Sequence, residues 1–197
     1  MPTLKLLVAV FALSACSAAS APPPGAPVRL PEFPVVGAAG WLNSSPLRLA
    51  DLRGRVVLVE FWTYGCSNCR NTLPWLKQAA RQYRDDGLVV VAVHTPEFPA
   101  ERERGNVERA LPRLGIDYPV LLDPDSAYWN AVGNRYWPAF WLLDREGRLV
   151  ATAIGELHAG EARAARFEAA MKTALEAAPP SVASAHSGRP NIANRAN

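Results

Sequence analysis

The sequence is poor in cysteine, in net charge and in long apolar runs, and each shortage excludes a class of protein. Its three cysteines among 197 residues are too few for a disulfide-stapled scaffold or a self-contained four-cysteine zinc site. Its 21 Lys and Arg residues are interspersed with 18 Asp and Glu residues, for a net charge of +3, so no basic stripe points to nucleic acid. No apolar run approaches the roughly 20 residues that a membrane-spanning helix needs.

The remaining composition is typical of a folded globular chain. Apolar residues make up 49% and charged residues 20% of the sequence, unlike the low hydrophobicity and high charge of disordered proteins. Against about 150 residues per domain, the length leaves room for one core plus extensions.

Residues 1–15 have the features of an export signal. Lys5 precedes an apolar run from Leu6 to Leu13, and small residues follow up to Cys16. The segment Leu13–Cys16 resembles the bacterial lipoprotein lipobox, in which the cysteine becomes the lipidated first residue of the mature chain. We therefore predict a lipid anchor on Cys16 and a location on the periplasmic side of the bacterial envelope. The alternative is a secretory signal cleaved near residues 18–21, which leaves Cys16 inert or removes it.

Composition divides the rest of the chain into three parts. Residues 16–32 are rich in proline and are predicted to form an extended tether. Residues 33–178 are predicted to form the folded domain, and residues 179–197, which lack apolar periodicity, a disordered tail.

Within the domain, apolar runs of strand length alternate with helical periodicity. The predicted strands cover residues 56–61, 88–93, 119–122, 139–143 and 148–154. The predicted helices cover 68–85, a segment around 107–114, a short segment that starts near Asp125, a suitable N-cap, and stops near Gly133, and 161–177. The last two strands are close enough to form an antiparallel hairpin through residues 144–147. This order predicts an α/β fold with a mixed central sheet flanked by helices.

A cysteine pair, Cys66-Ser67-Asn68-Cys69, follows the first core strand and opens the first long helix. The unpaired N–H groups and positive dipole at a helix start stabilise an anion there, so Cys66 is predicted to be a nucleophile with a lowered thiol pKa. Cys69 would then resolve the mixed disulfide that Cys66 forms with a substrate. The alternatives are half of a zinc site with the scattered His94, His158 and His186, a structural disulfide, or two buried thiols.

The segment Phe61–Cys69 resembles the active site of the thioredoxin superfamily, and most closely the bacterial envelope redoxins of the TlpA/ResA group and the thioredoxin-like domain of DipZ proteins. The likeness extends over about residues 30–175 and is carried by further motifs in the same order. These are Gly40–Asn43, Leu49–Gly54, Val93–Phe98 and Gly133–Pro138. The resemblance implies a thioredoxin-like fold with an N-terminal extension and a central insert.

The resemblance also implies roles for single residues. Glu60, six residues before Cys66, matches a buried acid that exchanges a proton with Cys69, and burial should raise its pKa. Pro138 matches a cis-proline that places the backbone of Trp137 beside an extended substrate segment. Pro74 matches the proline that kinks the active-site helix. The alternatives are a Glu60 paired with an arginine and a trans Pro138 at a strand start.

The sequence departs from thioredoxin in three ways. Ser67-Asn68 replaces the Gly-Pro dipeptide between the cysteines, and Gly65 replaces the tryptophan before the first cysteine. An insert of about 25 residues precedes the Trp137-Pro138 turn. Its aromatic residues Tyr128 and Trp129 are interpreted as core rather than as a partner surface.

The predicted function is that of an envelope-facing thiol–disulfide oxidoreductase that reduces protein disulfides and needs no cofactor or bound metal. Its expected partners are envelope protein thiols and disulfides and a membrane electron donor, and the chain is expected to be a monomer. The alternatives are a thiol peroxidase, suggested by Thr63 three residues before Cys66, a copper-binding lipoprotein, and a scaffold in which the pair is vestigial.

Overall fold

The computed structural model describes residues 25–178, which form one α/β domain. The predicted export signal, Cys16, most of the predicted tether and the predicted tail lie outside the described residues. Three short 3-10 helices accompany the larger elements: η1 (Ala38–Gly40), η2 (Leu49–Leu52) and η3 (Pro99–Arg102). The strands are β1 (Trp41–Leu42), β2 (Val56–Trp62), β3 (Leu88–His94), β4 (Val120–Leu122), β5 (Ala139–Leu143) and β6 (Leu149–Ile154). The helices are α1 (Ser67–Gln82), α2 (Arg104–Leu114), α3 (Ala127–Val132) and α4 (Ala162–Glu176).

The six strands form one mixed sheet in the order β1-β4-β3-β2-β5-β6. Strands β2, β3 and β4 run parallel, whereas β1, β5 and β6 pair antiparallel with their neighbours. The central strands β2 and β3 are buried along their whole length, which explains their continuous apolar sequences. Because β2 lies in the middle of the sheet, the turn that follows it is held by strands on both sides.

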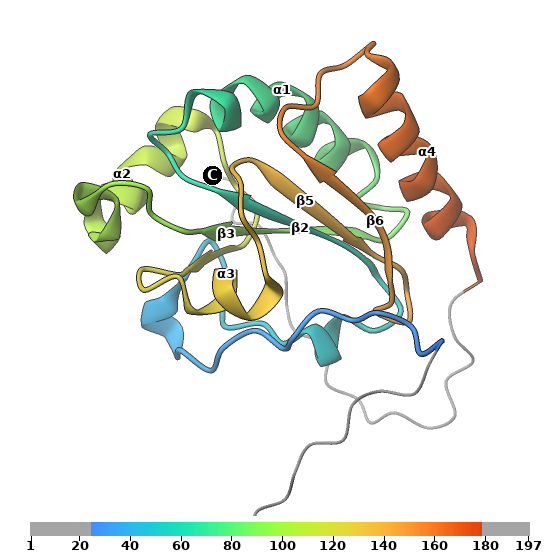
Figure 1. The fold of residues 1–197 in the computed structure, drawn as a ribbon, viewed down its shortest axis with the longest axis horizontal. Coiled ribbons are helices and arrows are strands. Elements are labelled where there is room, and N and C mark those ends of the chain that lie inside the picture. The colour runs from blue at the N-terminus through green and yellow to red at the C-terminus, as the bar shows by residue number, and fades with distance from the viewer. Residues whose placement is uncertain (1–24, 179–197) are drawn as a thin grey trace, which may run out of the picture.

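Each face of the sheet has its own hydrophobic cluster. The first cluster joins the sheet to α1, α2 and α4, and includes Trp75, Leu111 and Met171. Figure 1 shows α1 and α4 side by side over this face, with α3 on the other side of the sheet. The second cluster packs Phe33 from the N-terminal segment and Tyr128 from α3 against the opposite face. The predicted mixed sheet with helices on both faces is confirmed.

The structure gives the predicted elements within a few residues of their expected ends, with one error at α3. Asp125 was predicted to cap this helix, but the residue before α3 is Ser126, in a left-handed conformation with φ 56°. The capping carboxylate belongs to Asp123, whose oxygens accept the N–H groups of Tyr128 and Trp129 at 2.9 and 3.0 Å. The tight turn between Asp123 and Ser126 brings the earlier acid to the helix start.

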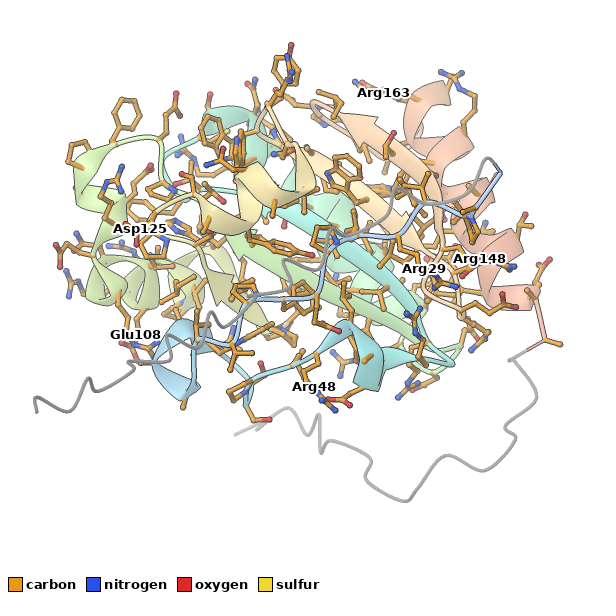
Figure 2. All side chains as sticks on the ribbon, turned by 60° about the horizontal axis from the view of Figure 1, so that its bottom comes forward. Arg29, Arg48, Glu108, Asp125, Arg148 and Arg163 are labelled. Atoms are coloured by element: carbon orange, nitrogen blue, oxygen red, sulfur yellow. The ribbon has the colours of Figure 1, made fainter. Side chains whose placement is uncertain are left out.

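The last residues of the predicted tether lie against the domain. The Leu149 N–H donates to the Val28 carbonyl at 2.8 Å, and the Glu32 carboxylate accepts the N–H groups of Leu49 and Ala50. Figure 2 shows Arg29 and Arg148 at one end of the molecule and Glu108 and Asp125 at the other. The segment around residue 30 is therefore part of the packed structure.

None of the helices in residues 25–178 is long and apolar enough to cross a membrane.

We predict that Phe140→Ala lowers the free energy of unfolding by about 3–5 kcal/mol, because it empties a large space in the core. Phe140 is fully buried in β5, and its ring lies 5.8 Å from Trp75 of α1 and 6.2 Å from Phe167 of α4. Urea unfolding measures the loss. Val150→Ala, at a position 46% exposed on β6, should change stability by no more than about 0.5 kcal/mol. Equal losses in the two variants would contradict this description of the core.

Candidate active site

The cysteine pair lies where β2 leads into α1. Cys66 is the N-cap residue of α1, and its sulfur accepts the backbone N–H of Cys69 at 3.2 Å. Cys66 is partly buried, Cys69 is fully buried, and both are free thiols in this structure. The outer thiol can therefore meet a large substrate, and the inner one can react only with its neighbour.

The two thiols have opposite acidities. A hydrogen bond from the Cys69 thiol, together with the N–H groups of Cys69 and Asn68, lowers the pKa of Cys66 to about 7 against the effect of its burial. The same thiol hydrogen bond and burial raise the pKa of Cys69 far above its ordinary value. Cys66 is thus the sulfur that ionises near neutral pH, and Cys69 keeps its proton.

Glu60 lies on β2, in the strand that leads to the cysteine pair, and its side chain is fully buried. Among residues 25–178, neither of its carboxylate oxygens has a hydrogen-bond partner and no arginine pairs with it, so the alternative of an arginine pair gains no support. Burial raises its pKa to about 8, and the negative charge on Cys66 adds to the rise. The charge of Glu60 in turn helps to raise the pKa of Cys69, which places the acid close to the inner thiol.

Residues 137 and 138 form the turn into β5, and the peptide bond between Trp137 and Pro138 is cis, as the resemblance implies. The Pro138 carbonyl accepts the N–H of Gly155 at 2.8 Å. The Trp137 indole N–H donates to the Thr95 carbonyl at 3.1 Å, and its ring lies 4.2 Å from that of Trp129. The turn is therefore braced from β6, from the loop after β3, and from α3.

The aromatic residues of the insert divide between two roles. Tyr128 is buried, stacks on Phe61 at 5.9 Å and belongs to the second core cluster, in agreement with its interpretation as core. Trp129 is only partly buried, and it packs between Phe61 and the Trp137 ring. It connects the core to the Pro138 turn.

Three polar residues near the pair were missed or undervalued by sequence reasoning: Thr63, His94 and Glu101. His94 is buried at the end of β3, and its Nε2 lies 3.2 Å from the Thr63 hydroxyl. Burial lowers the pKa of His94 to about 4, so the ring is neutral at ordinary pH. Glu101 is buried in η3, although it stands in a charged run, Glu-Arg-Glu-Arg, that is typical of a solvated surface. No local pattern in the sequence marks these contacts, because they join segments about 30 residues apart.

The alternatives from the sequence gain no support from the geometry. The Thr63 hydroxyl, on which the peroxidase alternative depended, contacts His94. Within residues 25–178, no three His, Cys, Asp or Glu side chains are grouped so that they could hold a metal ion. His186 lies outside the described residues.

Comparison with known proteins agrees with this fold and site. The family model described as Redoxin matches residues 29–170. Protein DipZ of Mycobacterium bovis is 44% identical over 123 residues, which cover 61% of this chain and 18% of DipZ. The thiol-disulfide oxidoreductase YkuV of Bacillus subtilis is 30% identical over 122 residues, or 62% of this chain and 82% of YkuV. A solved thiol:disulfide interchange protein of the thioredoxin family from Chlorobium tepidum superposes with a TM-score of 0.59 at 25% identity, covering 80% of this chain and 99% of that one.

The fold and the paired thiols define a protein of the thioredoxin-like class. Because the family model covers most of the domain, the chain belongs to the redoxin family. The resemblance and the fold class inferred from the sequence are confirmed. The chain nevertheless spans less than a fifth of the length of DipZ.

We predict that iodoacetamide alkylates Cys66 with a midpoint near pH 7, because the start of α1 and the Cys69 thiol stabilise its thiolate. An ordinary cysteine shows a midpoint near about 8.5. Mass spectrometry of the reduced protein should find no label on the buried Cys69. A midpoint at the ordinary value, or labelling of Cys69 before Cys66, would contradict the assignment.

We predict that the free energy of unfolding of Glu60→Gln, relative to that of the parent, increases as the pH rises. Between pH 4.5 and 7, folded Glu60, whose pKa is about 8, keeps a proton that the unfolded chain has released. The folded state therefore binds more protons, and this group's contribution to stability falls with rising pH, by about 1.4 kcal/mol per unit. Glutamine has no proton to lose.

Urea unfolding of both proteins at several pH values measures this difference. Glu108→Gln, which changes an exposed side chain on α2, is the matched control and should run parallel to the parent. If Glu60→Gln also runs parallel to the parent, the buried acid does not hold its proton.

Proposed function

We propose that this protein is an envelope-facing thiol–disulfide oxidoreductase that reduces disulfides in envelope proteins. The observation that carries the proposal is the arrangement of the two thiols. Cys66 is accessible, ionises near neutral pH and caps α1, while Cys69 lies buried and protonated behind it. A nucleophile backed by a resolving thiol is the arrangement that disulfide exchange requires.

In the first step the Cys66 thiolate attacks one sulfur of a client disulfide. A bond forms between Cys66 and that sulfur, the client S–S bond breaks, and the second client sulfur leaves as a thiolate that takes a proton from water. The product is a mixed disulfide between Cys66 and the client. The N-terminal end of α1 favours this step because it keeps Cys66 ionised.

In the second step the Cys69 sulfur attacks Cys66, so that a Cys66–Cys69 disulfide forms and the bond between Cys66 and the client breaks. The client sulfur leaves as a thiolate and takes a proton from solvent, which completes the client dithiol. Cys69 must lose its proton, and we propose that Glu60, after giving its own proton to solvent, is the buried base that receives it. The Cys66 charge, which raises the pKa of Glu60 in the dithiol form, disappears in the mixed disulfide. The carboxylate therefore becomes easier to form at the stage where a base is needed.

The client segment is proposed to lie along the Trp137-Pro138 turn. An extended segment there could pair with the Trp137 backbone while its sulfur faces Cys66. The bracing of this turn by Gly155, Thr95 and Trp129 supports a rigid platform of this kind.

The envelope location rests on the sequence. The export signal in residues 1–15, the lipobox cysteine Cys16 and the Pro-rich residues 16–32 support a domain held near a membrane surface. The Cys66–Cys69 disulfide formed in each cycle needs two electrons and two protons, and an envelope has no thiol buffer of its own. A membrane thiol donor is the proposed source, and the domain is proposed to work as a monomer.

Single cysteine variants test the proposal. In insulin reduction driven by dithiothreitol, we expect Cys66→Ser to fall to the rate of dithiothreitol alone, because no nucleophile remains. Cys69→Ser should accumulate a mixed disulfide between Cys66 and the client, visible as a mass increase that excess reductant removes. The full chain with Cys16→Ser is the matched control and should keep the parent rate.

If Cys66→Ser keeps the parent rate, the proposed function is wrong. If Cys69→Ser turns over without a trapped adduct, the two-step exchange is wrong.

A further inference from the structure

Glu101 is a buried carboxylate that lies 36 residues along the chain from the turn before Cys66 and contacts that turn directly. The residue is 3% exposed. Its Oε1 accepts the N–H of Gly65 at 2.9 Å, and its Oε2 accepts the N–H groups of Glu97 and Phe98 at 2.7 and 3.0 Å. One side chain thus ties the reactive turn to the loop after β3.

This carboxylate is held as an anion without a cationic partner among the described residues. Burial would raise its pKa, but the N–H groups of Phe98, Glu97 and Gly65 and the hydroxyl of Thr63 lower it below the ordinary value. A buried charge is costly unless hydrogen bonds compensate for the lost water. Here the backbone supplies those bonds, from Gly65 in the active-site turn and from Glu97 and Phe98 in the loop after β3. Removal of the carboxylate would therefore leave buried N–H groups without an acceptor.

Thr63 extends the contact into the sheet. Its side chain is fully buried, its hydroxyl lies 3.2 Å from His94 Nε2, and its carbonyl accepts the Cys66 N–H at 3.3 Å. Its own N–H helps to lower the pKa of the inner thiol of Cys69. A neutral His94 can donate to Thr63 while Thr63 donates to Glu101. Thr63 therefore connects the anion to both cysteines through the backbone.

The turn is held from the other side by Arg70 of α1. Its guanidinium donates to the carbonyls of Tyr64 and Gly65 at 3.0 and 2.8 Å. The peptide unit between Tyr64 and Gly65 is therefore held at its N–H by Glu101 and at its carbonyl by Arg70. Arg70 also holds the carbonyl of the next peptide unit, between Gly65 and Cys66. These two peptide units, directly before the nucleophile, have little freedom to rotate.

The close approach of the Glu101 carboxylate to Gly65 leaves little space for a side chain at this position. A Cβ added there would lie 2.3 Å from the Glu101 Oε1 atom, which no side chain can tolerate without displacing the carboxylate. Gly65 is exposed and has no positive φ, so the glycine is not explained by backbone conformation. The carboxylate explains it.

We propose that Glu101 is a positioning residue for the turn Thr63–Cys66 and sets the reactivity of Cys66 without touching its sulfur. The inference rests on the proposed function, in which Cys66 is the nucleophile. The sulfur receives its stabilising N–H groups from Cys69 and Asn68, and these are well aimed only while the turn keeps the Cys66 backbone in place. Glu101 holds that turn through Gly65 and Thr63.

The test compares the pH profile of Cys66 alkylation in Glu101→Gln and in the parent. Glutamine has the same size, but its NH2 group cannot accept hydrogen bonds, so at least one N–H loses its partner. The turn then shifts and the N–H groups aim less well at the sulfur. We expect the midpoint to rise by about 0.5–1 pH unit, as a weakened hydrogen bond to a thiolate implies. Glu103→Gln, an exposed neighbour with the same change of charge, should keep the parent midpoint.

A merely structural role gives a different result. It would lower the unfolding temperature of Glu101→Gln and leave the alkylation midpoint of the folded protein unchanged, and that outcome overturns the proposal. A rise of the same size in Glu103→Gln would also overturn it, because the effect would then not depend on the buried contact with Gly65; the loss of a negative charge by itself lowers a thiol pKa.

Gly65→Ala provides a second variant that leaves all charges in place and pushes on Oε1. We expect the same upward shift, and this variant decides the question if Glu101→Gln does not fold. An unchanged midpoint in folded Gly65→Ala overturns the proposal. The parent protein distinguishes the proposed function from the role of Glu101. A parent midpoint at the ordinary cysteine value contradicts the proposed function. A low parent midpoint that neither variant changes contradicts only the role of Glu101.

Discussion

The hydrogen bond from the Cys69 N–H to the Cys66 sulfur is the interaction on which the rest of the site depends. It exists because Cys66 occupies the N-cap position of α1, where backbone N–H groups have no partner inside the helix. A thiolate at this position satisfies one of them and interacts favourably with the helix dipole. The sheet fixes where α1 begins, because β2 is paired on both sides up to the turn. The reactivity of one sulfur therefore depends on the packing of the whole central sheet.

Two buried glutamates near this sulfur show how their surroundings shift the pKa values of two identical carboxyl groups in opposite directions. Glu60 has no hydrogen-bond partner among residues 25–178, so burial, with a smaller contribution from the Cys66 charge, raises its pKa to about 8 and keeps its proton on at neutral pH. Glu101 accepts three backbone N–H groups, so its pKa is lowered and it stays charged. An acid that must exchange a proton needs a buried site without hydrogen bonds, as Glu60 has. An acid that must hold a backbone segment in place needs hydrogen-bond donors around it, as Glu101 has.

Sequence reasoning succeeded where the information is local. The continuous apolar strands, the helix periodicity and the pair at the strand-to-helix junction are properties of neighbouring residues, and the structure places them as expected. Glu60 and Pro138 were named as candidate site residues because a family resemblance supplied their positions. The capping role of Asp123 was assigned to Asp125, since only the fold of the intervening turn shows which carboxylate reaches the helix. Glu101 was missed altogether because its hydrogen bond to the active-site turn comes from Gly65, 36 residues earlier in the chain.

The departures from the thioredoxin pattern become intelligible when they are considered together. Glycine before the first cysteine could be taken as the loss of an aromatic surface for partners. In this fold the same position lies against the Glu101 carboxylate, which leaves no room for any side chain. The loop after β3 carries Thr95, whose carbonyl accepts the Trp137 indole N–H, and it leads directly into η3, which carries Glu101. This continuous segment therefore contacts both the turn before the nucleophile, through Glu101, and the turn proposed to receive the client, through Thr95. The glycine before the nucleophile therefore lies against the same segment that holds the Trp137 side chain.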